Sequence, residues 1–495
     1  MRCRGAFLCL ALALAACAED AVKLTSPGPE TPWRPAGHES QAWNGGGGKK
    51  DFGIPPDPAL AVLPARPDID LRRSYRLPEL IDIAQRNNPA TRGAWQRARE
   101  AALAVGMVEA TFLPVITANV IAGRQTTSTP LPLPIGSRRS FDTTVDGISP
   151  SIGLQWLLFD FGRRAALADA ARHGTLAANV LFNGEHQRLI FDVTRAYYVH
   201  AASTTRSRIA RETLRNSTAI RNASEARLES GLGTTVEVAQ ARQQVAQSEL
   251  RRVQADGQER NSHQALLLAM GVNPTLPLKV DTGGQRRLPD APELPIDDMV
   301  SAALARRPDV MASYQAMQAS KAGIAAARAE FFPNVFVAGA LAARRNNFEA
   351  GGLPTIGQQA TGSGVLLGAT VPLYDSGLRA ARLRQAEASA SAAESTFQRT
   401  QNVAVSEIVT ARNMLRTALE SHRAASALTA AATVTYDAAL GAYRSGVGTV
   451  TAATAADTGL LDARQAQADT YAAAVVGAAN LAFAVGAMTS PDAVP

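Results

Sequence analysis

The chain contains an internal duplication, and no other feature of its sequence constrains the fold as strongly. Prolines and glycines recur at equal intervals in the two halves: Pro89 to Pro114 and Pro308 to Pro333 each span twenty-five residues, and Gly231 to Gly271 and Gly446 to Gly486 each span forty. The segment LFDFG at 158–162 likewise corresponds to LYDSG at 373–377. Such a period means that one structural unit is built twice. We therefore expect a first repeat at 75–280 and a second at 290–488.

Long helices are expected to make up most of each repeat. The chain is 46% hydrophobic but only 5% aromatic, a composition that suits closely packed helices. Residues such as Ala404, Ile408, Ala411 and Leu415 recur at steps of three and four, which is typical of a heptad seam. Prolines and glycines delimit the helices. The expected helices are 77–88, 89–112, 161–230, 234–270, 295–307, 308–332, 377–445 and 449–485. Of these, 77–88, 89–112, 295–307 and 308–332 are expected to pair end to end with one another and so restore the full length on the return side.

Each repeat also contains two segments without charged residues that show the alternation of β-strands. They are 115–123 and 149–159 in the first repeat, and 334–343 and 363–374 in the second. We expect polar loops, at 124–148 and 344–362, to join each pair. Charge-free strands of about 9 to 11 residues suit a membrane barrel, although a soluble antiparallel sheet is the alternative. Four strands cannot close a barrel in lipid, so a membrane role requires several chains to share one barrel.

The N-terminus predicts export and lipidation. Residues 1–16 carry two arginines and then the apolar run AFLCLALALAA, which has the form of a signal peptide. LAAC at 14–17 resembles a bacterial lipobox, in which Cys17 becomes the lipid-bearing first residue, whereas cleavage after Ala18 is the alternative. Cys3 and Cys9 lie in the signal, so Cys17 would be an unpaired thiol in an oxidising compartment unless it is used.

Composition delimits the remaining terminal segments and excludes several functions. Residues 17–74 are rich in proline and glycine and predict a lipidated N-terminal tether, while 489–495 form a C-terminal tail. Histidines are scattered without an H-E-x-x-H motif, and NGGGGKK lacks the spacing of a P-loop. The net charge of +7 is dispersed among acids, which favours solvated helix faces over nucleic-acid binding. The alanine-rich segment 472–488 predicts a buried helix end, not a membrane helix. We expect no enzyme activity, cofactor, metal or nucleic acid.

The lipobox, proline-bounded helices, strand pairs and glycine-broken long helices together resemble the TolC-like outer-membrane efflux proteins over residues 75–488. The resemblance implies a mainly α fold with transmembrane β-strands: a homotrimer pools twelve strands into an outer-membrane barrel that a periplasmic α-helical barrel continues. It further implies a lipid-anchored protein of the cell outer membrane that extends into the periplasm. Such a channel passively conducts drugs or other small molecules from an inner-membrane pump of RND or ABC type and a periplasmic adaptor. The alternatives are a type I protein-secretion channel, a structural coiled-coil lipoprotein and an exported enzyme.

Two glycine-containing turns match the family's docking sites. In the family, these turns are the tips of helical hairpins, which dock between the hairpins of the adaptor. The matching segments are SGLGT at 230–234 and SGVGT at 445–449. Glycine supplies positive φ and permits close backbone approach, and threonine caps the returning helix, so ordinary turn chemistry is the alternative. The candidate docking residues are Gly231, Gly233, Thr234, Gly446, Gly448 and Thr449.

The resemblance also implies a periplasmic gate just inside the tips. Family members narrow the tube there with a ring of acidic residues, and the matching positions are Thr454 and Asp457, so only one acid remains. Three facing Asp457 carboxylates would have raised pKa values and attract cations. An exposed Asp457 without a gate role is the alternative. Arg242, near the equivalent place in the first repeat, is a candidate to pair with an acid across the mouth.

Overall fold

The computed structural model describes residues 69–135, 138–283, 287–288, 295–350 and 354–489, with the short stretches 25–26, 28–31, 52 and 58–61. The chain divides into two compact units, Met1–Arg66 and Pro67–Pro495. In the first unit, the described element is the short helix η1 (Pro58–Leu60). The predicted signal peptide and Cys17 lie outside the described residues. The following account concerns the second unit.

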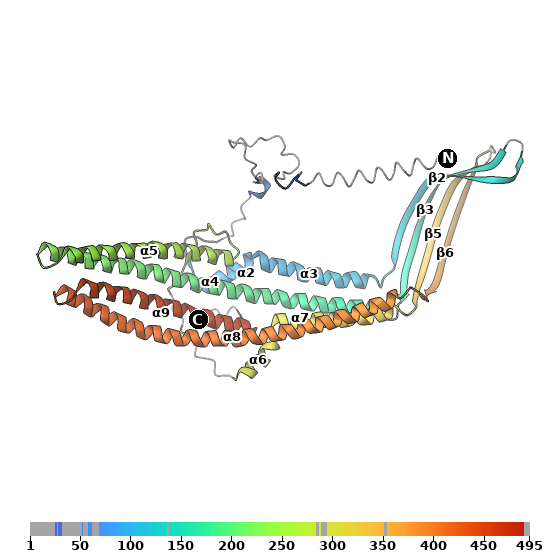
Figure 1. The fold of residues 1–495 in the computed structure, drawn as a ribbon. Coiled ribbons are helices and arrows are strands. Elements are labelled where there is room, and N and C mark those ends of the chain that lie inside the picture. The colour runs from blue at the N-terminus through green and yellow to red at the C-terminus, as the bar shows by residue number, and fades with distance from the viewer. Residues whose placement is uncertain are drawn as a thin grey trace. The chain divides into compact units, whose positions relative to one another are not determined.

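The helices of the second unit follow the duplication closely. The first repeat contains α2 (Leu77–Asn87), α3 (Pro89–Ala110), α4 (Arg163–Glu229) and α5 (Thr235–Ala269), and the second contains α6 (Ile296–Leu304), α7 (Pro308–Ala329), α8 (Leu378–Arg444) and α9 (Val450–Ala484). The two longest helices, α4 and α8, each have 67 residues. Each turns back into a 35-residue helix at a hairpin tip, at the end opposite the sheet (Figure 1).

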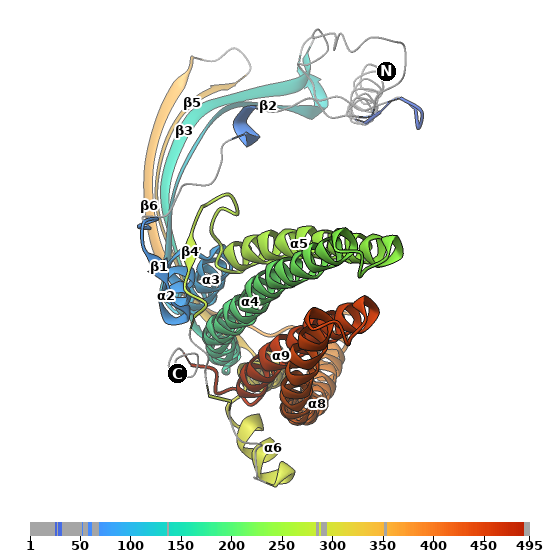
Figure 2. The same ribbon diagram turned by 90° about the vertical axis from the view of Figure 1, so that its left-hand side faces the viewer.

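The helices form a curved wall, seen end-on in Figure 2. Helices α3 and α5 lie along α4, whereas α7 and α9 lie between α4 and α8. Gly271 and Gly486 show how the shorter helices stack end to end. A Cβ atom at Gly271 would lie 2.8 Å from the Asn88 Cα atom, and one at Gly486 would lie 3.1 Å from the Arg307 Cα atom. The end of α5 therefore abuts the start of α3, and the end of α9 abuts the start of α7.

One antiparallel sheet, and not two separate strand pairs, extends from the helices. It consists of β2 (Val115–Ile135), β3 (Arg138–Phe159), β5 (Asn334–Ala350) and β6 (Ile356–Thr370), paired in that order. The β3–β5 pairing, with Gln155 opposite Ala338, joins the two repeats. Within this chain, β2 and β6 are the edges of the sheet.

The expected loops at 124–148 and 344–362 were wrong, because most of these residues continue the strands. Their polar side chains are satisfied across the sheet: Thr126 hydrogen-bonds Thr144 at 3.1 Å, and the Arg124 guanidinium donates to both Asp146 carboxylate oxygens at 2.6 and 3.1 Å. A polar segment is not necessarily a loop, because threonine also favours strands. At its other end β6 stops at Thr370, short of the expected 374, because Pro372 cannot donate a ladder hydrogen bond.

The sheet has an uncharged half next to the helices and a charged half beyond it. Arg124 pairs with Asp146 in register, and Asp146 lies opposite Asn347, beside Arg345 on β5. Counted along the strands from the helices, the charged residues of neighbouring strands therefore begin at the same distance. The uncharged half has the length that a membrane-spanning strand requires, about 9 to 11 residues.

The main apolar core lies where α2 meets α4, α5 and α9. Leu80, Ile81, Val193 and Leu266 are fully buried there. Two short strands that sequence analysis missed, β1 (Ser74–Tyr75) and β4 (Lys279–Val280), pair in parallel beside this core. Across the residues that the structure describes, no helix combines the length and apolar character needed to cross a membrane. Residues 472–484 form the end of α9, and 485–488 follow it, so the predicted helix end is confirmed.

Candidate functional site

The two hairpin tips have the same backbone geometry. In each tip, the first and the second glycine are required for different reasons. Gly231 and Gly446 have positive φ values of 75° and 84°, a conformation that side chains disfavour. At Gly233, an added Cβ would lie 3.0 Å from the Leu228 amide nitrogen, and at Gly448 it would lie 2.8 Å from that of Tyr443. The close approach expected of glycine is therefore an approach to the chain's own preceding helix.

Thr234 and Thr449 cap the helices that return from the tips. The Thr234 hydroxyl accepts a hydrogen bond from the Glu237 amide at 3.2 Å, and Glu237 completes a capping box. The Thr449 hydroxyl accepts from the Ala452 amide at 3.2 Å. Both caps satisfy an amide that the first turn of a helix leaves without a partner. The predicted capping role is confirmed at both positions.

Each tip presents an apolar side chain that sequence analysis missed. Leu232 and Val447 stand between the two glycines of their turns and are 73% and 84% exposed. Their repetition in both turns was a visible signal, because an apolar residue at the apex of a polar turn buries no surface within its own chain. These side chains form the apolar part of an exposed tip, at which Gly231 and Gly446 are exposed as well.

A buried contact ties the two tips of one chain together. The Tyr443 ring is fully buried, and its hydroxyl lies 2.6 Å from the Ser224 hydroxyl on α4. The Arg227 guanidinium lies 5.4 Å from the centre of the Tyr443 ring and donates to the Tyr443 carbonyl at 3.4 Å. Because Tyr443 belongs to α8, this contact sets the spacing of the tips.

The exposed alternative for Asp457 was wrong, and within one chain its side chain points into the packing against α4, whereas a ring formed by three chains stays a prediction. The Asp457 side chain is 1% exposed, and its carboxylate accepts hydrogen bonds from the Asn216 amide at 3.2 Å and the Ser217 hydroxyl at 3.0 Å, both on α4. Burial raises the pKa of the Asp457 carboxyl, and these two hydrogen bonds oppose the rise. Helical phase explains the error: spacing from Gly448 did not reveal which side of α9 faces α4.

The expected pairing of Arg242 across the mouth also differs from the structure. The Arg242 guanidinium donates to Glu225 of the same hairpin at 2.9 and 3.1 Å. Glu225 lies on α4 and Arg242 on α5, so this contact fastens the hairpin to itself. No acid from another chain is needed to neutralise Arg242.

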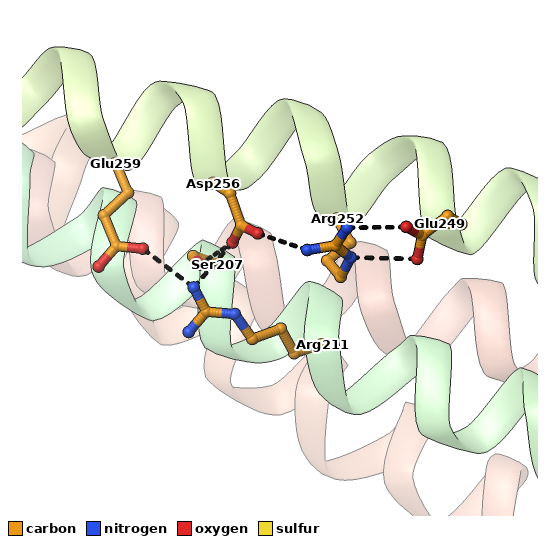
Figure 3. A network of polar contacts seen from close by, with 6 residues as sticks. All are labelled: Ser207, Arg211, Glu249, Arg252, Asp256 and Glu259. Carbon is orange, nitrogen blue, oxygen red and sulfur yellow. Dashed lines mark hydrogen bonds and ion pairs between the residues drawn. The ribbon is translucent and has the colours of Figure 1, made fainter.

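A larger polar network fastens α5 to α4 further from the tip (Figure 3). At its centre, the Asp256 carboxylate accepts from the Ser207 hydroxyl at 2.6 Å, from Arg211 at 2.8 Å and from Arg252 at 2.7 Å. The hydrogen bond from Ser207 is the largest cause that lowers the pKa of Asp256, and the two guanidinium groups lower it further. The hairpin is therefore held by charge-assisted hydrogen bonds as well as by its seam.

The duplicated segments LFDFG and LYDSG form the junctions between sheet and long helix. Asp160 is 5% exposed and accepts from both the amide and the guanidinium of Arg164 at 2.9 Å. Asp375 bonds Arg379 in the same way in the second repeat. Sequence analysis noted the repetition without assigning it a role. The D-x-x-x-R spacing was the signal, since i,i+4 pairs meet on one helix face.

His200 is buried between α4 and α5 and makes stability depend on pH. Its Nδ1 lies 3.1 Å from the Ser262 hydroxyl, and its ring centre is 5.3 Å from that of His263. Burial, with repulsion from His263 second, lowers the pKa of His200 from 6.5 to about 4. Among the described residues, no group of three or more side chains could hold a metal ion.

The protein is expected to lose stability as the pH falls from 6.5 toward 4. In this window the unfolded chain binds a proton at His200 and the folded chain does not, so acid favours unfolding, by up to about 3 kcal/mol. Melting temperatures at pH 7.5 and 5 measure the effect for the wild type and for His200→Gln. The variant should lose less stability between the two pH values, and an identical loss would contradict the assignment.

Long helices with hairpin tips at one end, joined to an open-edged antiparallel sheet at the other, define the subunit of an envelope channel. The family model "Outer membrane efflux protein" matches residues 80–272 and 299–487. The chain therefore belongs to the outer membrane efflux protein family. It is an efflux channel protein of the cell outer membrane, as the resemblance implied.

Individual relatives agree with this assignment. The chain is 28% identical to Protein CyaE of Bordetella pertussis over 88% of this chain and 92% of CyaE. It is 27% identical to outer membrane protein OprJ of Pseudomonas aeruginosa over 84% of this chain and 83% of OprJ. The solved outer-membrane channel OprN has the same fold, with a TM-score of 0.70 and 23% identity over 84% of this chain and 93% of OprN. The predicted fold class is confirmed.

Proposed function

We propose that three copies of this chain form one channel, in which their sheets close a twelve-stranded barrel and their helices a continuous tube. The observation that carries this proposal is the four-stranded sheet with unpaired edges at β2 and β6. Unpaired strand edges are not tolerated in lipid, and four strands are too few to enclose a barrel. Pairing β2 of one copy with β6 of the next removes every edge by symmetry.

The channel passively conducts drugs or other small molecules that an inner-membrane pump, of RND or ABC type, delivers through a periplasmic adaptor. The tips are the docking surface for the adaptor: Gly231, Gly233, Gly446 and Gly448 shape them, and Leu232 and Val447 make the contact. The exposure of two apolar side chains at equivalent positions supports this role, because such residues mark binding sites. Thr234 and Thr449 hold the returning helices in place behind the contact.

In this proposal, Asp457 controls the aperture from inside the wall. Its hydrogen bonds to Asn216 and Ser217 join α9 of the second hairpin to α4 of the first. Tyr443 and Ser224 make a second such contact at the tip. Together these contacts hold the two hairpins of one chain in register, so the aperture at the tips depends on whether they are kept.

Single-channel recording tests the conduction proposal. Purified protein added to a planar lipid bilayer should produce discrete, stable conductance steps without a pump or an energy source. A bilayer that stays sealed at protein concentrations where trimers are present would contradict a passive channel. A Cys17→Ala variant in the same assay provides a matched control, because the anchor is not part of the conducting path.

Cys17 is proposed as the lipid anchor, and palmitate labelling tests it. Cells grown with labelled palmitate should yield labelled wild-type protein and unlabelled Cys17→Ala protein, because the lipid is attached to the side chain of Cys17. Ala18→Ser, one residue further along, should keep the label. Equal labelling of the wild type and Cys17→Ala would show that lipid is attached elsewhere, and an unlabelled wild type would favour cleavage after Ala18.

A further inference from the structure

A large cavity lies among the helices, away from the exposed side chains of the hairpin tips. It has a volume of about 1000 Å³ and lies where α4, α8 and α9 meet the segment that links the two repeats. That segment contributes Thr282, Gly283, Arg287 and Leu288. A cavity of this size matches the upper range of small-molecule sites. Its position at the junction of the repeats separates it from both the tips and the sheet.

The lining of the cavity is strongly cationic. Arg208, Arg287 and Arg464 contribute three guanidinium groups, and Glu212 is the one acid among the lining residues. The Glu212 carboxylate pairs with Arg464 at 3.1 Å. No ion pair joins Arg208 or Arg287 to any described residue. Two positive charges from different elements therefore face one cavity without an ion-pair partner among the residues that the structure describes.

The remaining lining supplies an apolar floor and a free hydrogen-bonding group. Tyr198 and Ile209 are 7% and 4% exposed and form part of the floor, together with alanines of α4 and α9. The Thr204 hydroxyl is buried and has no hydrogen-bond partner among the described residues. A buried polar atom without a partner costs about 1 to 3 kcal/mol, which a bound ligand or a water molecule would relieve. This observation is independent of the arginines.

We propose that this cavity binds an organic anion with a flat apolar body. Arg208 and Arg287 would hold the anionic group, since guanidinium groups form paired hydrogen bonds with carboxylate, sulfonate and phosphate oxygens. The body of the ligand would lie against Tyr198 and Ile209, with the Thr204 hydroxyl within the site. A purely inorganic anion would leave this floor uncovered, and a neutral aromatic molecule would leave both guanidinium groups unpaired.

Two fluorescent probes that differ by one sulfonate group test the proposal on the full-length protein in detergent. The probes are 8-anilinonaphthalene-1-sulfonate and its neutral analogue N-phenyl-1-naphthylamine. The variant is Arg208→Gln with Arg287→Gln, and the matched control is Arg215→Gln with Arg384→Gln, which removes two exposed arginines outside the cavity. Because both cavity arginines are exposed, folding should be unaffected, and equal helicity by circular dichroism checks this.

The anionic probe should bind the wild type and the control saturably, and bind the cavity variant about tenfold more weakly or worse. The neutral probe should not distinguish the three proteins. Raising sodium chloride from about 50 to about 500 mM should weaken wild-type binding of the anionic probe alone, because salt screens exposed charges. Equal binding of the anionic probe to all three proteins, an equal loss of both probes, or no effect of salt would overturn the proposal. The salt experiment requires no variant.

Discussion

Replacing Leu232 and Val447 together with aspartate is expected to abolish efflux while trimers still form. Both side chains are more than two-thirds exposed, at 73% and 84%, and fill no part of the core, so the substitutions should change the stability of the protein by less than about 0.5 kcal/mol. At a docking surface, however, each aspartate would place a charge against an apolar contact, and six such charges would surround the mouth of a trimer. Loss of docking should therefore be complete, and drug susceptibility should equal that of cells lacking the gene.

Minimum inhibitory concentrations, with outer-membrane abundance on the same cells, measure this effect. Leu232→Met with Val447→Ile is the matched control, since it keeps apolar side chains at both apices and should preserve resistance. Substituting the tip glycines would be less informative, because a side chain at Gly448 would clash with the preceding helix at 2.8 Å. Wild-type resistance in the double aspartate variant would remove the docking role of the tips.

Arg164→Ala is expected to destabilise the protein by about 3 to 5 kcal/mol. Arg164 is 7% exposed, and besides Asp160 its guanidinium donates to the Thr111 carbonyl at 2.8 Å and the Leu158 carbonyl at 3.3 Å. Truncation would leave the buried Asp160 carboxylate without its cation and two carbonyls without a donor. The junction between β3 and α4 should then fail to hold the sheet against the helices.

Arg379→Ala at the equivalent junction serves as the comparison. The side chains of Arg379 and Asp375 are 13% and 24% exposed, so water can replace part of the lost interaction. We therefore expect a smaller loss of stability than at Arg164. Thermal unfolding of both variants in detergent, with the yield of assembled protein, measures the difference. Equal losses at the two junctions would show that burial of the first pair does not decide its strength.

Local chemistry predicted the helices and turns well. Prolines and glycines at fixed places set the helix ends, and positive φ at Gly231 and Gly446 followed from the same turns. The strands were underestimated because Thr126, Thr144 and their neighbours are polar, and a polar run between two apolar strands also fits a loop. Asp457 was misplaced because its partners Asn216 and Ser217 lie on α4, in the other repeat. Arg242 was misplaced although its partner Glu225 faces it across the same hairpin, because only the resemblance to the family was used to place it. The cavity required the meeting of both repeats and so was not accessible to sequence analysis.

The central claim, that neighbouring copies of the chain pair edge to edge, has a direct test in the duplication itself. Gln155 on β3 lies opposite Ala338 on β5. Their counterparts in the other repeat are Thr370 on β6 and Asn119 on β2, which should therefore lie opposite each other between copies. Paired residues on antiparallel strands are close enough for a disulfide bond.

The decisive measurement is the oxidation of an Asn119→Cys with Thr370→Cys variant in outer membranes, analysed on a denaturing gel without reductant. We predict covalent dimers and trimers that disappear on reduction, with no larger species, because a closed ring of three leaves no free edge. Asn119→Cys with Gln358→Cys, which places the second cysteine at the far end of β6, should remain monomeric. A ladder that continues beyond three copies, or monomers alone from the Asn119–Thr370 pair, would contradict the trimeric channel.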